Sequence, residues 1–137
     1  MNSITQPSVL VVDDDPYSTD LARLTLTHLG FTEVKVACNG KDGLRALEAM
    51  PLPPDFLLCD IFMPDMDGIE FSEELAKRRY AGGVILISGG DVQMLALAKQ
   101  IALESGLNVL GALTKPLQQV ELSKAFAAAT HPWRSSP

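Results

Sequence analysis

Short apolar runs of four or five residues recur along the chain, and longer segments with helical periodicity separate them. Most of these runs are rich in β-branched and aliphatic side chains, which is typical of strands buried on both faces of a sheet. They predict five strands, at Val9–Val12, Glu33–Ala37, Phe56–Cys59, Val84–Ile87 and Val109–Leu113.

Five helices are expected between and after these strands. Asp15, Asp67 and Asp91 stand where N-caps are needed, and Gly30 and Gly106 stand where helices end. The expected helices cover Pro16–Leu29, Lys41–Met50, the residues after Asp67 to Arg79, those after Asp91 to Ser105, and Leu117 to about Ala129.

The regular alternation of strand and helix predicts an α/β fold. Parallel neighbours need a helical crossover, so we expect a doubly wound, flavodoxin-like sandwich with a parallel five-stranded sheet in the order 2-1-3-4-5. The length of 137 residues suits one domain. We expect that domain over residues 8–129, with an N-terminal tail at 1–7 and, at 130–137, a C-terminal tail or the start of a linker to an absent output domain.

Composition narrows the range of partners and compartments. The chain has 11 Lys and Arg against 17 Asp and Glu, a net charge of −6, which argues against nucleic acid or an anionic membrane surface as the partner. It shows no secretory signal pattern and no apolar run near the roughly twenty residues of a membrane span, so we expect a cytoplasmic protein. Cys38 and Cys59 are expected to be buried thiols and not a disulfide.

Acidic residues are concentrated at the ends of two expected strands. Asp13 and Asp14 follow the first strand, and Asp60 follows the third. In the expected order these strands are neighbours, and ligands of open parallel sheets bind beyond the carboxyl ends of the strands, where the strand order reverses. The three carboxylates are therefore expected in one crevice.

Such a cluster needs a counter-charge, because two carboxylates about 4 to 6 Å apart repel each other by roughly 3 to 4 kcal/mol at an effective dielectric near 20. Mg²⁺, or Mn²⁺ in its place, suits these oxygen donors. Lys115, after the fifth strand, supplies a second positive charge, and Ser88, after the fourth, adds a hydroxyl.

Taken singly, most of these residues also have a structural explanation. Acids such as Asp13 and Asp14 stabilise the start of a helix, Asp67 caps one, and Ser88 begins a turn. Asp60 is the exception, because an unpaired carboxylate between apolar residues is costly. The joint placement of acids, hydroxyl and lysine after successive strands favours a functional site.

Four segments resemble the receiver domains of two-component response regulators, the chemotaxis-regulator-like phosphoacceptor family. The likeness extends from Ser8 to about Ala129. Its motifs are the acidic-pair segment Val9–Pro16, the phosphoacceptor segment Leu57–Gly68, the hydroxyl segment Ile87–Gly89 and the lysine segment Thr114–Pro116.

The resemblance implies a phosphoacceptor and a metal site. Asp60 would accept a phosphoryl group, and Asp13 and Asp14 would hold Mg²⁺ together with Asp60 and the backbone carbonyl of Phe62. One of the acidic pair would bind partly through water.

The resemblance also implies how the phosphoryl group is held. Ser88 and the Gly89 amide would bond its oxygens, and Lys115 would pair first with Asp60 and then with the phosphate. Pro116 would follow a cis peptide bond. Loose phosphoryl transfer depends on positioning and charge neutralisation, which these residues would supply. The chain would thus act as a regulatory domain that catalyses only its own phosphorylation and dephosphorylation.

Three departures from the family pattern lead to expectations of their own. Ala112 stands where the family usually has an aromatic switch residue, so we expect output through displacement of the loop at Gly89 and Gly90 and of the helix after it. Phe62 should impede hydrolytic water and prolong the phosphorylated state, whereas Gly90 offers no side chain there. Extra length is present before the fifth strand, at residues 107–111.

Partners are expected outside the chain. We interpret His28 and His131 as surface residues, so the phosphoryl donor would be a sensor histidine kinase or phosphotransfer protein. An output domain or partner protein is implied, and a looser resemblance favours a cyclic-di-GMP phosphodiesterase domain. The fourth helix is apolar enough either to be deeply buried or to contact another domain or a second copy of the chain. In the last case, a homodimer would form through the fourth helix, the fifth strand and the fifth helix.

Three other functions fit these residues less well. A pseudo-receiver that binds partners without phosphorylation would be expected to lack an acid or the lysine. A small haloacid-dehalogenase-like phosphatase requires Asp-x-Asp, but Phe62 stands two residues after Asp60. In a flavodoxin, the three acids would repel the cofactor phosphate.

Overall fold

The computed structural model describes residues 7–129, in which strands and helices alternate. The strands are β1 (Ser8–Val12), β2 (Glu33–Ala37), β3 (Phe56–Asp60), β4 (Gly83–Ser88) and β5 (Asn108–Thr114). The helices are α1 (Pro16–His28), α2 (Gly40–Ala49), α3 (Gly68–Lys77), α4 (Val92–Glu104) and α5 (Gln119–Ala127). The expected C-terminal tail, with His131, and most of the expected N-terminal tail lie outside the described residues.

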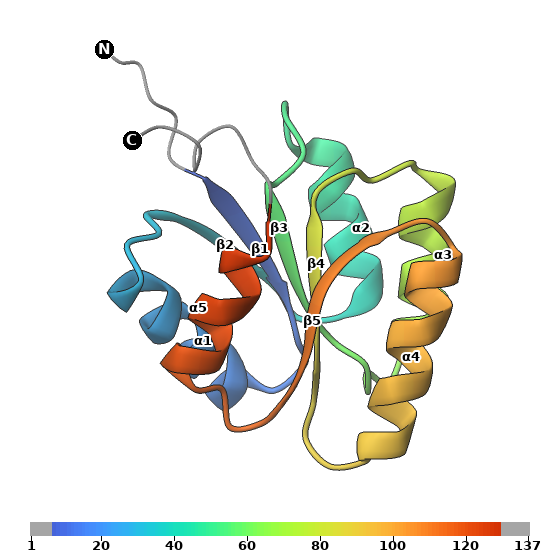
Figure 1. Cartoon of the computed structure of the whole chain (residues 1–137). Helices are drawn as coiled ribbons and strands as arrows, with labels where there is room; N and C mark the ends of the chain where they lie inside the picture. The colour runs from blue at the N-terminus through green and yellow to red at the C-terminus, as the bar shows by residue number, and fades with distance from the viewer. Residues whose placement is uncertain (1–6, 130–137) are drawn as a thin grey trace.

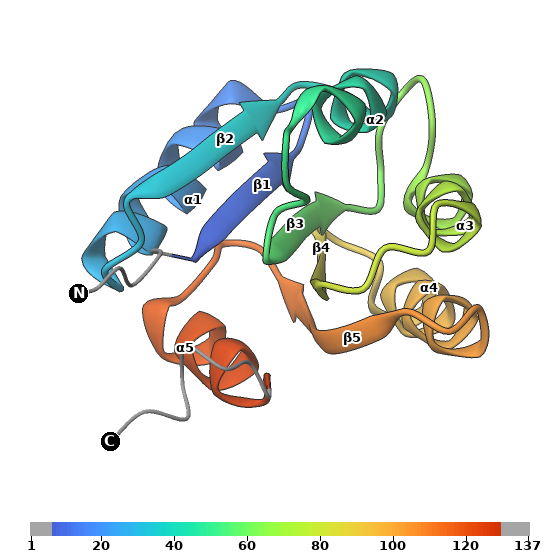
Figure 2. The same ribbon diagram turned by 90° about the horizontal axis from the view of Figure 1, so that it is seen from above.

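All strand pairs are parallel, and the sheet has the order β2-β1-β3-β4-β5. The predicted doubly wound fold and strand order are therefore confirmed. Helices α1 and α5 cover one face of the sheet, and α2, α3 and α4 cover the other (Figures 1 and 2).

Burial along the strands follows their position in the sheet. Every residue of β3 and β4 is buried, because these strands have neighbours on both sides and helices on both faces. The edge strand β2 instead alternates between exposed and more buried residues. The continuous apolar runs in the sequence therefore mark the centre of the sheet.

Two separate cores fill the spaces between sheet and helices. One lies under α2, α3 and α4 and includes Phe71 and Leu75. The other lies under α1 and α5, where the rings of Phe31, Phe56 and Phe126 are packed with centroid separations of 4.7 to 6.0 Å. Together they hold every strand between two apolar layers.

The extra length expected before the fifth strand lies inside it as a bulge. The β4–β5 register shifts between Val84 and Ile85, which leaves Leu110 without a counterpart. As a result, Val109 and Ala112 both pack on the core under α4. The extra residue therefore decides which face Ala112 occupies.

Two local expectations need correction. Cys38 is exposed, not buried, because it follows the edge strand β2, and its Sγ donates to Asp42 Oδ2 at 3.3 Å; Cys59 is buried as expected, and both cysteines are free. The helix expected from Leu117 begins at Gln119, because the chain bends at Lys115 and Pro116 and the next two residues are irregular.

Candidate functional site

The site lies at the carboxyl ends of the strands, at the lower edge of the sheet in Figure 1. Val12 of β1 pairs with Cys59 of β3, so the next residues, Asp13 and Asp60, emerge side by side. Both are buried, with 2% and 4% of their surfaces exposed, whereas Asp14 is exposed. One carboxylate oxygen from each of the three lies within 4.8 Å of the others.

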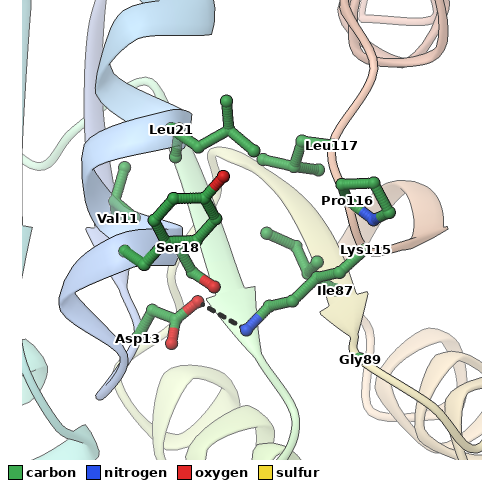
Figure 3. A pocket seen from close by; sticks show the side chains of 11 residues that line it. Val11, Asp13, Ser18, Leu21, Ile87, Gly89, Lys115, Pro116 and Leu117 are labelled. Atoms are coloured by element: carbon green, nitrogen blue, oxygen red, sulfur yellow. Dashed lines mark ion pairs between the residues drawn. The ribbon is translucent and has the colours of Figure 1, made fainter.

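Lys115 crosses the crevice from the segment after β5 and joins two of these carboxylates. Its Nζ lies 3.0 Å from Asp13 Oδ2 and 2.9 Å from Asp60 Oδ2. Figure 3 shows the ammonium group of Lys115 pointing toward Asp13. One cation therefore neutralises part of the charge of two buried acids.

The remaining oxygens of the two buried acids are held by the backbone. Asp13 Oδ1 accepts from the Asp15 amide, and Asp60 Oδ1 accepts from the Phe62 amide, each at 2.9 Å. Each carboxylate thus has one oxygen on an amide and the other on Lys115. Both are fixed in orientation before any ligand arrives.

The same contacts shift the pKa values of Lys115 and Asp60. Burial would lower the pKa of Lys115, but its bonds to Asp60 and Asp13 outweigh burial and raise it, so the ammonium form is favoured. Burial raises the pKa of Asp60 above its ordinary value, opposed by Lys115 and the Phe62 amide. A further cation near Asp60 would therefore favour its ionised form.

Ser88 ends β4 next to this crevice and is fully buried. Its Oγ accepts from the Gly90 amide at 3.3 Å, and its carbonyl oxygen accepts from the Lys115 amide at 2.8 Å. A backbone hydrogen bond therefore connects Ser88, which carries the hydroxyl, to Lys115. Gly89 and Gly90 are exposed, and a Cβ atom at Gly90 would meet nothing within 4 Å.

Three other residues named from the sequence surround the site or lie behind it. The Phe62 side chain, two residues after Asp60, is 47% exposed. Ala112 is half-buried against the core under α4. The Lys115–Pro116 peptide bond is cis, as expected.

Comparison with known proteins identifies the family. A family model described as the response regulator receiver domain matches residues 9–127. The chain belongs to this family. Receiver domains are regulatory phosphoacceptor domains of two-component systems and not enzymes in the ordinary sense.

Several relatives are longer proteins. The positive alginate biosynthesis regulatory protein of Pseudomonas aeruginosa is 32% identical over 130 residues, which is 93% of this chain and 48% of that protein. The sensor histidine kinase RcsC of Salmonella typhi is 34% identical over 119 residues, 87% of this chain and 12% of the kinase. A solved probable two-component response regulator/GGDEF domain protein is 30% identical with a TM-score of 0.74, covering 89% of this chain and 48% of that one. The chain thus spans about half or less of these relatives.

The acidic cluster of this receiver domain has the chemistry of a divalent-metal site. Asp13, Asp14 and Asp60 present hard oxygen donors close together, a set that suits Mg²⁺ or Mn²⁺. Asp14 has no protein partner in the described contacts and faces solvent, so its carboxylate is available to an ion. The residues present therefore fit the expected metal.

A cavity of about 320 Å³ adjoins the site between α1 and the segment before α5. Figure 3 shows Leu21 and Leu117 along it and Asp13 with Lys115 at one end. Pro116 also lines this cavity.

Within residues 7–129, no helix combines the length and apolar character of a membrane span.

Sequence reasoning missed one residue near the site. Asp65 accepts hydrogen bonds from the first two amides of α2, Gly40 at 3.2 Å and Lys41 at 3.0 Å. Twenty-five residues separate Asp65 from Gly40, and no local pattern indicates a bond over that distance. The only sequence signal was the acid itself within the phosphoacceptor segment Leu57–Gly68.

Proposed function

We propose that this receiver domain is a phosphorylation-dependent switch in which Asp60 accepts a phosphoryl group from a histidine of a sensor kinase or phosphotransfer protein. The observation that carries the proposal is the bridge from Lys115 to Asp13 and Asp60 at 3.0 and 2.9 Å. It puts a cation beside a buried, oriented carboxylate and close to a third acid, Asp14, that has no partner among residues 7–129.

In the proposed reaction, an Asp60 carboxylate oxygen attacks the phosphorus atom of a phosphohistidine. The new O–P bond forms as the P–N bond breaks, and the imidazole leaves with its electron pair. A bound Mg²⁺, held by Asp13, Asp14, Asp60 and the Phe62 carbonyl, supplies charge neutralisation for the phosphoryl oxygens.

The chain's own groups hold the product. Lys115 remains protonated and pairs with a phosphoryl oxygen, consistent with its raised pKa. The Ser88 hydroxyl stops accepting the hydrogen bond from the Gly90 amide and instead donates one to a phosphoryl oxygen. The loop at Gly89 and Gly90 then moves toward Asp60, since these glycines carry no side chain that blocks it.

The output passes through α4, because Ala112 has no ring that could report the change. Val92, Leu97 and Leu103 are exposed apolar residues on α4, and we propose that this surface, with β5 and α5, meets an output domain or a second copy. The GGDEF domain protein shows a receiver in a longer chain. A cyclic-di-GMP phosphodiesterase output remains a prediction.

Acyl-phosphate labelling tests the proposed function. The full chain is incubated with acetyl phosphate and MgCl₂, and hydroxylamine-labile phosphate is measured by mass spectrometry. We expect one phosphoryl group in the wild type, none in Asp60→Asn, and none in EDTA. Asp20→Asn, which removes an exposed carboxylate of α1, should be labelled normally.

Label that persists in Asp60→Asn would show that another residue is the acceptor. Absence of label in the wild type, from acetyl phosphate and from a phosphorylated kinase alike, would favour the alternative of a pseudo-receiver that binds partners without phosphorylation. Membership of the receiver family leaves no support for the small-phosphatase and flavodoxin interpretations.

A further inference from the structure

The loop between β3 and α3, residues 61–67, carries the Phe62 carbonyl proposed as a metal ligand. Both of its ends are fixed. The Ile61 amide donates to Ile87 at 3.0 Å, and the Gly68 amide donates to the Ile61 carbonyl at 2.9 Å. Asp67 caps α3 by accepting from Glu70 at 2.8 Å.

The middle of the loop is attached to a different helix through Asp65. The two carboxylate oxygens accept from separate amides of α2, Gly40 and Lys41. Asp65 is exposed; its slight desolvation would raise its pKa, but the Lys41 and Gly40 amides hold the pKa below its ordinary value, so the charged form is the one that α2 binds. An anion at a helix N-terminus also interacts favourably with the helix dipole.

Close packing reinforces this attachment. A Cβ atom at Gly40 would lie 2.8 Å from Met66 Cβ, so the loop sits directly on the first turn of α2. Helix α2 is itself close to β1 and α3, since a Cβ atom at Gly43 would lie 3.0 Å from Val12 Cγ2 and 3.2 Å from a ring carbon of Phe71. Asp65 therefore connects the loop to a fixed part of the molecule.

We infer that Asp65 is a positioning residue for the metal site, one that fixes the backbone at Phe62 through its bonds to α2. The inference rests on the proposed function. Asp65 is three residues from Phe62 and touches neither the metal ligands nor the phosphoacceptor in the described contacts. It acts by limiting the conformations of the loop, in the way that residues behind a metal ligand orient it.

The test compares Asp65→Ala with Asn39→Ala in the full chain. Asn39 is the N-cap of α2 and accepts from Asp42 at 2.8 Å, so its replacement weakens the same helix end without touching the loop. Amide hydrogen exchange is measured without metal, and Mg²⁺ titrations are followed through the amide signals of Asp60 and Phe62. Thermal unfolding shows that each variant is folded.

In Asp65→Ala we expect the Phe62 amide to exchange faster without metal and the apparent Mg²⁺ Kd to rise about tenfold. Acetyl phosphate labelling should fall at low Mg²⁺ and recover at saturating Mg²⁺. Asp65→Asn, which retains one acceptor oxygen, should lie between Asp65→Ala and the wild type. Asn39→Ala should leave both the exchange and the Kd close to wild type.

Unchanged exchange at Phe62 in Asp65→Ala, or equal effects of Asp65→Ala and Asn39→Ala on the Kd, would overturn the inference. A wild-type chain that neither binds Mg²⁺ nor becomes labelled would instead refute the proposed function. The exchange measurement still decides whether Asp65 holds the loop in that case.

Discussion

At the scale of single residues, the site depends on one lysine shared by two buried acids. The backbone satisfies one oxygen of Asp13 and one of Asp60, but the other oxygen of each depends on Lys115. Removing that cation leaves two carboxylates with unneutralised charge in a buried crevice. The lysine therefore has a structural role in the metal-free protein in addition to the one proposed in phosphoryl transfer.

Replacing Lys115 should show this structural role. In EDTA, we expect Lys115→Met to lower the free energy of unfolding by about 3 kcal/mol, because the two acids lose their counter-charge. Mg²⁺ should restore most of the loss, since the ion neutralises the same carboxylates. Urea unfolding with and without Mg²⁺ measures both values, and an equal loss in the two conditions would contradict the explanation.

The exposed ring of Phe62 should affect how long the phosphorylated state lasts. An apolar side chain beside Asp60 disfavours ordered water, so Phe62→Asn should increase the rate of dephosphorylation severalfold. The decay of the acyl phosphate after removal of the donor gives the rate. Leu52→Asn, which changes an exposed apolar residue in the segment before β3, away from Asp60, is the control, and an unchanged rate in Phe62→Asn would refute the hypothesis.

At the scale of elements, α1, α3 and α4 end in the same backbone motif. A residue with positive φ lies two positions after the end of each helix, and the next amide donates to the helix carbonyl five residues before it. The positive-φ residue is Gly30 after α1 and Gly106 after α4, but Arg79 with φ of 55° after α3. A side chain in this conformation carries strain of about 1 kcal/mol.

We therefore expect Arg79→Gly to raise stability by about 1 kcal/mol, or roughly 4 °C in Tm. Arg79 forms no ion pair among the described residues, so its removal loses little. Gly106→Ala should have the opposite sign at the matching position. Thermal unfolding of both variants tests the pair, and a lower Tm for Arg79→Gly would show that its side chain makes a stabilising contact.

The loop from Ser88 to Gly90 and helix α4 form the proposed moving element. With beryllium fluoride as a phosphoryl mimic and Mg²⁺, we expect the amides of Gly89, Gly90 and the first turn of α4 to shift, while those of α2 stay in place. A structure with and without the mimic, or amide hydrogen exchange, measures this. Identical backbone positions in the two states would rule out the proposed output route.

At the scale of the whole molecule, the charge is unevenly distributed. Three of the 17 acids meet in one crevice, where their repulsion opposes folding. A bound ion removes that repulsion and binds only the folded chain, because only folding brings these carboxylates together. Metal binding and global stability are therefore linked.

Mg²⁺ at ten times its Kd should stabilise the fold by about 1.4 kcal/mol and raise Tm by roughly 5 °C. Asp14→Asn should remove most of this gain and should slightly raise the Tm in EDTA, because one of the three repelling charges is gone and Asp14 makes no described contact that would be lost. Calorimetry with MgCl₂ and with EDTA tests both statements. A full Mg²⁺ response in Asp14→Asn would exclude Asp14 as a ligand.

Local patterns along the chain were sufficient to predict which helices and strands form and in what order they follow one another. The unbroken apolar runs of β3 and β4 require burial on both faces, and the capping residues Asp15, Asp67 and Asp91 place three helix starts correctly. Asp60 could be recognised as a candidate site residue because apolar residues precede and follow it in the sequence. These features depend on neighbours in the chain, so they can be recognised without coordinates.

Contacts between distant segments could not be obtained in this way. The sharing of Lys115 by Asp13 and Asp60 depends on three strand ends meeting, and the Asp65 bonds to α2 depend on how a loop packs on a helix. Ala112 faces α4 only because a bulge shifts the register of β5. Residue types and periodicity specify which groups are available and on which element they stand. The packing of those elements sets the distances between the groups, because charge neutralisation and orientation depend on a few ångströms.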